Sequence, residues 1–219
     1  MPGYLMKTVA MTISGRVYKL RVLSDHQQYV VDQGAAELAG ISSATWPHFG
    51  QLWPAGSVLA EHLASFPIKG KRILEIGCGM ALSSLVLHGR GADITASDHH
   101  PLAARFLAHN CALNDMPPLP YVTAHWDRPD VGLGSFEVIV ASDVLYERGH
   151  AVAIAEFIVR HAAASAEVLI SDPGRGNAPA LRRLLIDQGF VCDEQRLAFA
   201  SGDRPPYRGR LLHFHRGIV

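Results

Sequence analysis

Short apolar runs alternate with segments of helical periodicity along most of the chain. The apolar runs predict strands over residues 72–76, 92–97, 121–125, 136–142, 167–171, 190–199 and 210–216. Apolar positions at helical spacing predict helices over residues 54–65, 81–87, 101–113, 151–164 and 178–189. No helix separates the last two strands. This order predicts an α/β fold with a seven-stranded mixed sheet, helices on both faces and an antiparallel terminal hairpin.

The N-terminal part of the chain follows a different pattern. Residues 12–23 alternate between apolar and polar side chains around Ser14 and Gly15, which predicts a short hairpin. Residues 33–40 predict a helical turn. We therefore divide the chain into an N-terminal hairpin and helical extension, residues 1–48, and a larger domain, residues 49–219.

Composition narrows the class of protein. The 219 residues are 48% hydrophobic, enough for one domain with a well-buried core. Lysine plus arginine equals aspartate plus glutamate at 20 each, and no basic block occurs, so we expect no nucleic-acid partner. Cys78, Cys111 and Cys192 form no C-x-x-C pair, which favours reduced thiols in the cytoplasm. We find no signal-peptide core and no apolar run of about 20 residues, so we expect no membrane partner.

The most informative segment is the glycine turn after the strand at residues 72–76. Gly77 and Gly79 allow a sharp bend and leave room for a ligand against the main chain, and a helix begins just beyond. Glu75 can accept a hydrogen bond from a hydroxyl or ammonium group but repels phosphate. A dinucleotide fingerprint would place its third glycine at Leu82. The segment therefore favours S-adenosylmethionine, although it is also compatible with a plain tight turn.

Polar residues follow the next strands at the same edge of the predicted sheet. Asp98 comes 19 positions after Gly79, a spacing at which an acid meets a ribose hydroxyl, although it could instead cap the helix near Pro101. Trp126 could lie on an adenine ring or serve as an ordinary core aromatic.

The end of the strand at residues 136–142 carries the clearest chemical signal. Asp143 could hydrogen-bond an incoming amine, orient it and take up a proton. Tyr146 could present its ring or its hydroxyl to the same amine. The alternatives are a turn cap for Asp143 and a packed aromatic for Tyr146. Arg175, after the next strand, could bind an acidic group of the substrate or cap carbonyls as a loop arginine.

Over about residues 49–214, the chain resembles the seven-strand methyltransferases of lysine methyltransferase family 16. The resemblance rests on FGQLWPAGSVLAEHL (49–63), ILEIGCGMA (73–81), ITASDHHP (94–101) and VIVASDVLYE (138–147). LISDPGR (169–175) and NCALN (110–114) look most like the branch that methylates the electron transfer flavoprotein β-subunit. The chain departs from the family pattern at Ala81, which replaces the third motif glycine.

The resemblance implies a class I methyltransferase (Rossmann-like) fold with S-adenosyl-L-methionine as cofactor and no metal. It implies a protein substrate with an accessible lysine, with the electron transfer flavoprotein β-subunit as one candidate. Asp143 and Tyr146 would lie at the acceptor amine. The expected cofactor-binding residues are Trp53, Glu75, Gly77, Cys78, Gly79, Asp98, His99, Trp126 and Ser142.

We therefore expect an S-adenosylmethionine-dependent N-methyltransferase acting on a protein lysine. The alternative within enzymes is an N-methyltransferase of a small amine or pyridine, which would have a closed pocket in place of an open polar rim. A nicotinamide-dependent oxidoreductase would need hydrogen-bond donors to the cofactor's phosphates at the position that Glu75 occupies. A catalytically silent binding protein would keep the cofactor pocket alone. His213 and His215 share a strand face, but no third ligand is placed beside them by the sequence.

Overall fold

The computed structural model describes residues 4–25, 28, 38–128, 132–199 and 206–217, and these form two sheets. An N-terminal hairpin pairs β1 (Met6–Ile13) with β2 (Arg16–Leu23). The larger sheet has seven strands in the order β5-β4-β3-β6-β7-β9-β8. Its strands are β3 (Arg72–Ile76), β4 (Asp93–Asp98), β5 (Tyr121–Thr123), β6 (Phe136–Ser142), β7 (Ala162–Asp172), β8 (Val191–Phe199) and β9 (Tyr207–Arg216).

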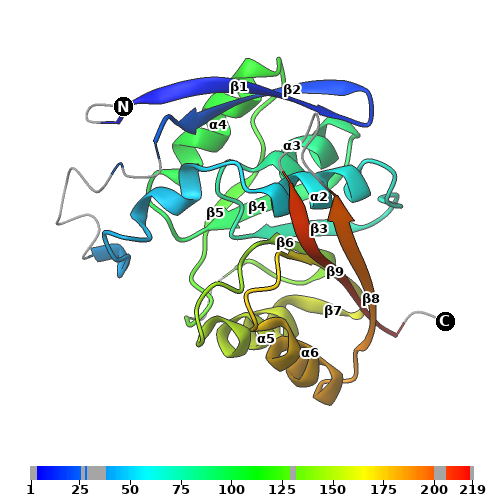
Figure 1. Cartoon of the computed structure of the whole chain (residues 1–219). Coiled ribbons are helices and arrows are strands. Elements are labelled where there is room, and N and C mark those ends of the chain that lie inside the picture. The colour runs from blue at the N-terminus through cyan, green and yellow to red at the C-terminus, as the bar shows by residue number, and fades with distance from the viewer. Residues whose placement is uncertain (1–3, 26–27, 29–37, 129–131, 200–205, 218–219) are drawn as a thin grey trace.

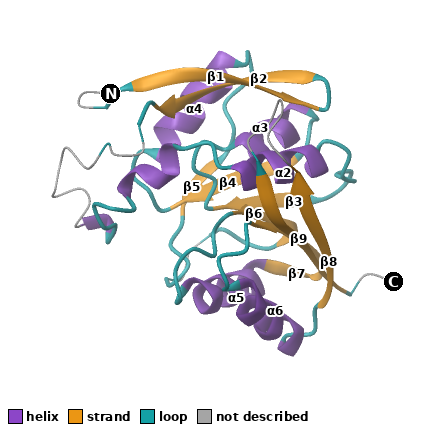
Figure 2. Cartoon of the chain, in the orientation of Figure 1, coloured by secondary structure: helices purple, strands orange, loops and turns teal. Residues whose placement is uncertain are grey.

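Helices cover both faces of the larger sheet (Figure 1). On one side lie α2 (Pro54–Leu63), α3 (Leu82–Gly89) and α4 (Ala103–Leu113), together with the N-terminal hairpin. On the other side lie α5 (His150–His161) and α6 (Ala178–Asp187), as Figure 2 shows. A 3-10 helix, η1 (Trp46–Gly50), precedes α2. The predicted α/β sheet with helices on both faces is confirmed.

Strand residues alternate between two apolar cores, which is why the strands read as continuous apolar runs. Ile73 and Val138 belong to the core beneath α2, α3 and α4, whereas Leu74 and Ile139 belong to the core beneath α5 and α6. Only β9 runs antiparallel to its neighbours β7 and β8, so the predicted terminal hairpin is confirmed.

Several boundaries differ from the prediction: β1 begins at Met6 and not at residue 12, and β5 ends at Thr123 and not at residue 125. The helix expected to reach residue 164 ends at His161, and β7 begins at Ala162 instead of residue 167. The reason is tertiary: the Arg216 side chain at the end of β9 donates to the carbonyls of Ala162 and Ala163, which holds this alanine-rich segment extended. The helical turn expected at residues 33–40 lies mostly outside the described residues.

The N-terminal hairpin is attached to α4 by asparagine side chains. Asn110 accepts from the Arg21 backbone N–H at 2.8 Å and donates to the Met80 carbonyl at 3.1 Å. Asn114 accepts from the Lys19 N–H at 2.8 Å and donates to the Lys19 carbonyl at 2.7 Å. The hairpin also shares the apolar core of α3 and α4. The division of the chain at residue 48 stays a prediction. Within the described part, no helix is long and apolar enough to cross a membrane.

Candidate active site

A cavity of about 570 Å³ opens where the carboxyl ends of β3, β4 and β6 meet, and this size suits a small-molecule ligand. All eleven residues expected at the cofactor and acceptor sites line it: Trp53, Glu75, Gly77, Cys78, Gly79, Asp98, His99, Trp126, Ser142, Asp143 and Tyr146. The structure therefore brings the predicted residues together, and their individual roles stay predictions.

The glycine turn forms one wall of the cavity and has no room for side chains. Gly77 and Gly79 have φ values of +61° and +52°. A Cβ atom on Gly77 would lie 2.9 Å from Val144 Cγ1, and one on Gly79 would lie 2.7 Å from the Phe49 carbonyl oxygen. The next residue of the motif, Ala81, adopts φ +63° and directly precedes α3. The turn is thus packed tightly against its protein neighbours and lines the cavity.

Glu75 lies beneath the turn and is 2% exposed. Its carboxylate accepts from the Ser84 backbone N–H at 2.9 Å and from the Ser84 hydroxyl, so it binds α3 while lining the cavity. Burial raises the pKa of Glu75 to about 7, because loss of hydration outweighs the stabilising hydrogen bonds from Ser84. This carboxyl can therefore exchange a proton near neutral pH.

Asp98, the last residue of β4, binds the glycine turn. Its carboxylate accepts from the Gly79 N–H and from the His100 N–H, each at 2.8 Å, and lies 3.6 Å from His99 Nδ1. It does not cap α4, whose N-cap residue is Leu102, so that alternative is excluded. The contact with Gly79 was not expected from the spacing, and it ties the ends of β3 and β4 together.

Two tryptophans enclose the cavity from other elements. Trp126 lies against the glycine turn, with its ring 3.1 Å from where a Gly77 Cβ would be, and its ring centroid is 5.1 Å from that of His150. Trp53, at the N-cap of α2, donates from its indole to the His48 carbonyl at 3.0 Å. Both rings are thus held in place by neighbours.

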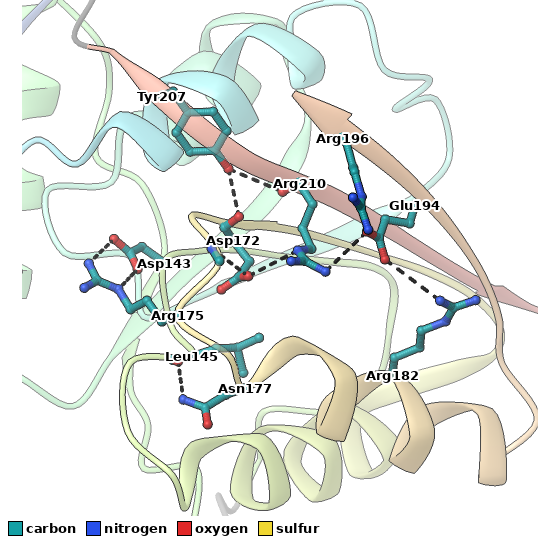
Figure 3. Close-up of polar contacts among 11 residues, drawn as sticks. Asp143, Leu145, Asp172, Arg175, Asn177, Arg182, Glu194, Arg196, Tyr207 and Arg210 are labelled. Atoms are coloured by element: carbon teal, nitrogen blue, oxygen red, sulfur yellow. Dashed lines mark hydrogen bonds and ion pairs between the residues drawn. The ribbon is translucent and has the colours of Figure 1, made fainter. Parts of the chain in front are cut away.

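Asp143 leaves β6 in a left-handed conformation, with φ +52°. Its N–H donates to the Ser171 carbonyl at 2.9 Å, which continues the parallel pairing and holds the strained residue. Both carboxylate oxygens bind Arg175: Oδ1 accepts from Nε at 2.7 Å and Oδ2 from Nη2 at 2.8 Å (Figure 3). Arg175 thus binds an acidic side chain of this chain, a contact that the sequence did not predict, and its expected role toward an acidic group of the substrate stays a prediction.

The Tyr146 ring lies between two histidines. Its centroid is 4.5 Å from that of His150 and 5.9 Å from that of His48, both edge-on. Burial, reinforced by nearby carboxylates, raises the pKa of the Tyr146 phenol, so it stays protonated at neutral pH. Sequence reasoning missed both histidines. Tyr146 lies in the loop before α5 and His48 lies in η1, so both contacts are set by the fold and not by a sequence spacing.

His213 and His215, considered as a possible ligand pair, are engaged separately. His213 Nε2 lies 2.8 Å from Glu167 and His215 Nε2 lies 3.4 Å from Asp193. No group of three or more metal-ligating side chains is found among the residues that the structure describes.

Comparison with known proteins agrees with this geometry. A family profile described as lysine methyltransferase matches residues 45–179, well over half of the chain. The zebrafish (Danio rerio) electron transfer flavoprotein β-subunit lysine methyltransferase is 32% identical over 137 residues, covering 59% of this chain and 51% of the relative. The rat (Rattus norvegicus) protein of the same name is 29% identical over 182 residues, covering 80% and 69%.

The fold has solved counterparts as well. Magnesium protoporphyrin IX methyltransferase from Synechocystis PCC 6803, with bound S-adenosylmethionine, superposes with a TM-score of 0.58 at 20% identity, covering 74% of this chain and 78% of that one. At this identity the likeness concerns the fold alone. This chain has a class I S-adenosylmethionine-dependent methyltransferase fold and belongs to the lysine methyltransferase family.

Proposed function

We propose that this chain transfers a methyl group from S-adenosylmethionine to the side-chain amine of a lysine in a protein. The observation that carries the proposal is that the glycine turn and the Asp143–Tyr146 pair line one cavity. Family membership supports both the cofactor and the type of acceptor.

The residues of the turn fit the cofactor. A Cβ at Gly77 or Gly79 would meet protein neighbours at under 3.0 Å, so this turn needs glycine in order to keep its close packing beside the cavity that it lines. In our assignment Glu75 receives the ammonium of the amino-acid end, Asp98 a ribose hydroxyl and Trp126 the adenine. When bound, S-adenosylmethionine supplies an electrophilic methyl group on sulfur.

The acceptor side consists of Asp143 and Tyr146. A lysine can attack only as the neutral amine, so its proton must first pass to solvent water. Its lone pair can then bond to the methyl carbon, while the electron pair of the carbon–sulfur bond would stay with sulfur. We assign Asp143 to orienting the amine and Tyr146, as a neutral phenol, to hydrogen-bonding it. Holding the amine in line is a proximity effect, which these fixed side chains can provide.

The rim of the cavity favours a protein over a small amine. Glu147 and Arg175 line the cavity with side chains that are 57% and 41% exposed, so charged groups surround the entrance. Because the relatives reported above are named for the electron transfer flavoprotein β-subunit, we propose that subunit as the first acceptor to test.

The test is transfer of tritium from labelled S-adenosylmethionine to purified electron transfer flavoprotein β-subunit. We expect labelling of a lysine, and a loss of at least about 100-fold in Asp143→Asn. Asp193→Asn is the matched control, since its carboxylate is 76% exposed and contacts His215 on β9. That variant should stay within about twofold of the parent chain.

Three outcomes would contradict the proposal at different levels. Calorimetric binding of S-adenosylhomocysteine without labelling of the subunit would reject this acceptor. Unchanged transfer in both Asp143→Asn and Tyr146→Phe would reject the acceptor-site assignment. Failure to bind S-adenosylhomocysteine would reject the cofactor site.

A further inference from the structure

The carboxylate assigned to the acceptor is already paired inside the protein. Arg175 binds it through two parallel hydrogen bonds of 2.7 and 2.8 Å, the geometry in which a guanidinium neutralises a carboxylate most completely (Figure 3). The Asp143 side chain is 6% exposed and that of Arg175 is 41% exposed. An amine entering the cavity therefore meets a neutral pair and not an isolated negative charge.

The loop that carries Arg175 is built to hold it there. Gly174 and Gly176, on either side, have φ values of +86° and +93°, which allow the loop to turn back over β6. The Gly174 N–H donates to Asp172 at 3.0 Å, and the Asn177 side chain donates to the Leu145 carbonyl at 2.8 Å. Both ends of the loop are thus anchored, and the guanidinium lies 5.8 Å from the centre of the Trp53 ring.

A neighbouring carboxylate, that of Asp172, is paired with a second arginine, Arg210. Asp172 is 1% exposed, and its Oδ2 lies 3.6 Å from Arg210 Nε. Arg210 in turn contacts Glu194 at 3.2 Å, and Glu194 contacts Arg182 at 3.9 Å (Figure 3). Opposite charges therefore alternate along this row, and the Arg175 guanidinium donates two hydrogen bonds to Asp143.

We propose that Arg175 is a positioning residue that neutralises Asp143, so that the acceptor lysine readily loses its proton to solvent water on entering the site. An unpaired carboxylate within hydrogen-bond reach would stabilise the ammonium form, which cannot accept a methyl group. A carboxylate already bound by a guanidinium still offers lone pairs to orient N–H groups, with much less attraction for the extra proton. This inference rests on the proposed function, because it concerns the acceptor of that reaction.

Other charged or titratable groups surround the same place and stay unchanged in the test. They come from η1, β3, β4, β6, α5, β7, β9 and the loops after β4 and β6: His48, Glu75, Asp98, His99, Tyr146, Glu147, His150, Asp172, Tyr207 and Arg210.

The direct test uses n-butylammonium as a lysine side-chain probe, with binding followed by saturation-transfer NMR at pH 7. We expect Arg175→Met to bind the probe at least about tenfold more tightly than the parent chain, because it exposes an unpaired carboxylate. The double variant Arg175→Met/Asp143→Asn should lose this gain. Arg175→Lys, which keeps the charge, should stay close to the parent. Arg182→Met, which removes an arginine at the far end of the row, is the matched control.

A gain of affinity cannot arise from a merely damaged loop, and calorimetric binding of S-adenosylhomocysteine to each variant checks that the rest of the site is intact. Equal affinities in the parent chain and Arg175→Met, including no detectable binding to either, would overturn the proposal. A gain that persists in the double variant would also overturn it. Because the NMR test needs no methyl transfer, it remains decisive if the electron transfer flavoprotein β-subunit is not the acceptor.

A second measurement is the pH profile of kcat at a saturating concentration of that subunit, because kcat reports the protonation state of the bound acceptor. In Arg175→Met the acid limb should move to higher pH by about one unit, because the acceptor ammonium is held more firmly. An unshifted limb with a lower plateau would mean that Arg175 is only structural, and would overturn the proposal.

Discussion

At the scale of single residues, Glu75 is the carboxyl group lining the cavity whose pKa is shifted most. It is 2% exposed, and burial raises its pKa to about 7, well above the ordinary value of a glutamate. The folded chain therefore binds a proton here that the unfolded chain releases at lower pH. The stability that this proton provides is present in acid and is lost as pH rises from about 4.5 to about 7.

Glu75→Gln should remove that dependence. Relative to the variant, the parent chain should lose about 2 to 3 kcal/mol in free energy of unfolding between pH 5 and pH 8. Urea unfolding of both chains at the two pH values measures this difference. A constant difference between the chains would mean that the carboxyl titrates normally in the folded state.

At the scale of elements, β9 holds the terminal part of the sheet together. It pairs antiparallel with both β7 and β8, and its Phe214 is fully buried in the core beneath α5 and α6. Among the strands of the described residues, β8 lies at the edge of the sheet and is hydrogen-bonded only to β9. Loss of packing at the centre of β9 should therefore weaken the whole hairpin.

Phe214→Ala should lower the free energy of unfolding by about 3 to 5 kcal/mol, because it leaves a large cavity in this core. Val191→Ala, on β8, is the matched control: its side chain is 58% exposed, and we expect less than about 0.5 kcal/mol. Chemical denaturation of the two variants makes the comparison. Similar losses would show that the hairpin is not organised around the core that contains Phe214.

At the scale of the whole molecule, Asn110 connects the N-terminal hairpin to the cofactor turn. The two ends of one buried amide bind Arg21 on β2 and Met80 just beyond the glycine turn. Asn114, one helical turn later, also binds β2 but lies closer to solvent. The hairpin and the active site are thus joined through α4.

Asn110→Ala should lower the free energy of unfolding by about 2 to 3 kcal/mol, because it leaves a buried backbone N–H and a buried carbonyl without a hydrogen-bond partner. It should also weaken binding of S-adenosylhomocysteine, since Met80 belongs to the turn. Asn114→Ala should cost about 1 kcal/mol or less and leave that affinity unchanged, because water can replace its bonds. Urea unfolding and titration calorimetry check both effects. Equal loss of affinity in the two variants would contradict a specific link through Met80.

Much of the fold could be predicted from local sequence. β3 and β6 begin and end at the predicted residues because each is an apolar run bounded by turn signals. The order of elements was enough to predict the mixed sheet, and the strand ends were enough to bring the expected site residues to one edge. Strand bounds and the order of elements depend on residues that are close in the chain, so they can be predicted from the sequence.

What the sequence by itself determined is therefore the periodicity of each element, the glycine turn and the acids that follow the strands. Only the tertiary structure decided that Arg175 would bind Asp143, 32 residues away, that Asp98 would bind Gly79, and that Ala162 would begin a strand. The physical reason is that periodicity and turn chemistry are set by adjacent residues. The partner of a charged side chain or an edge carbonyl depends on which segments the folded sheet places side by side.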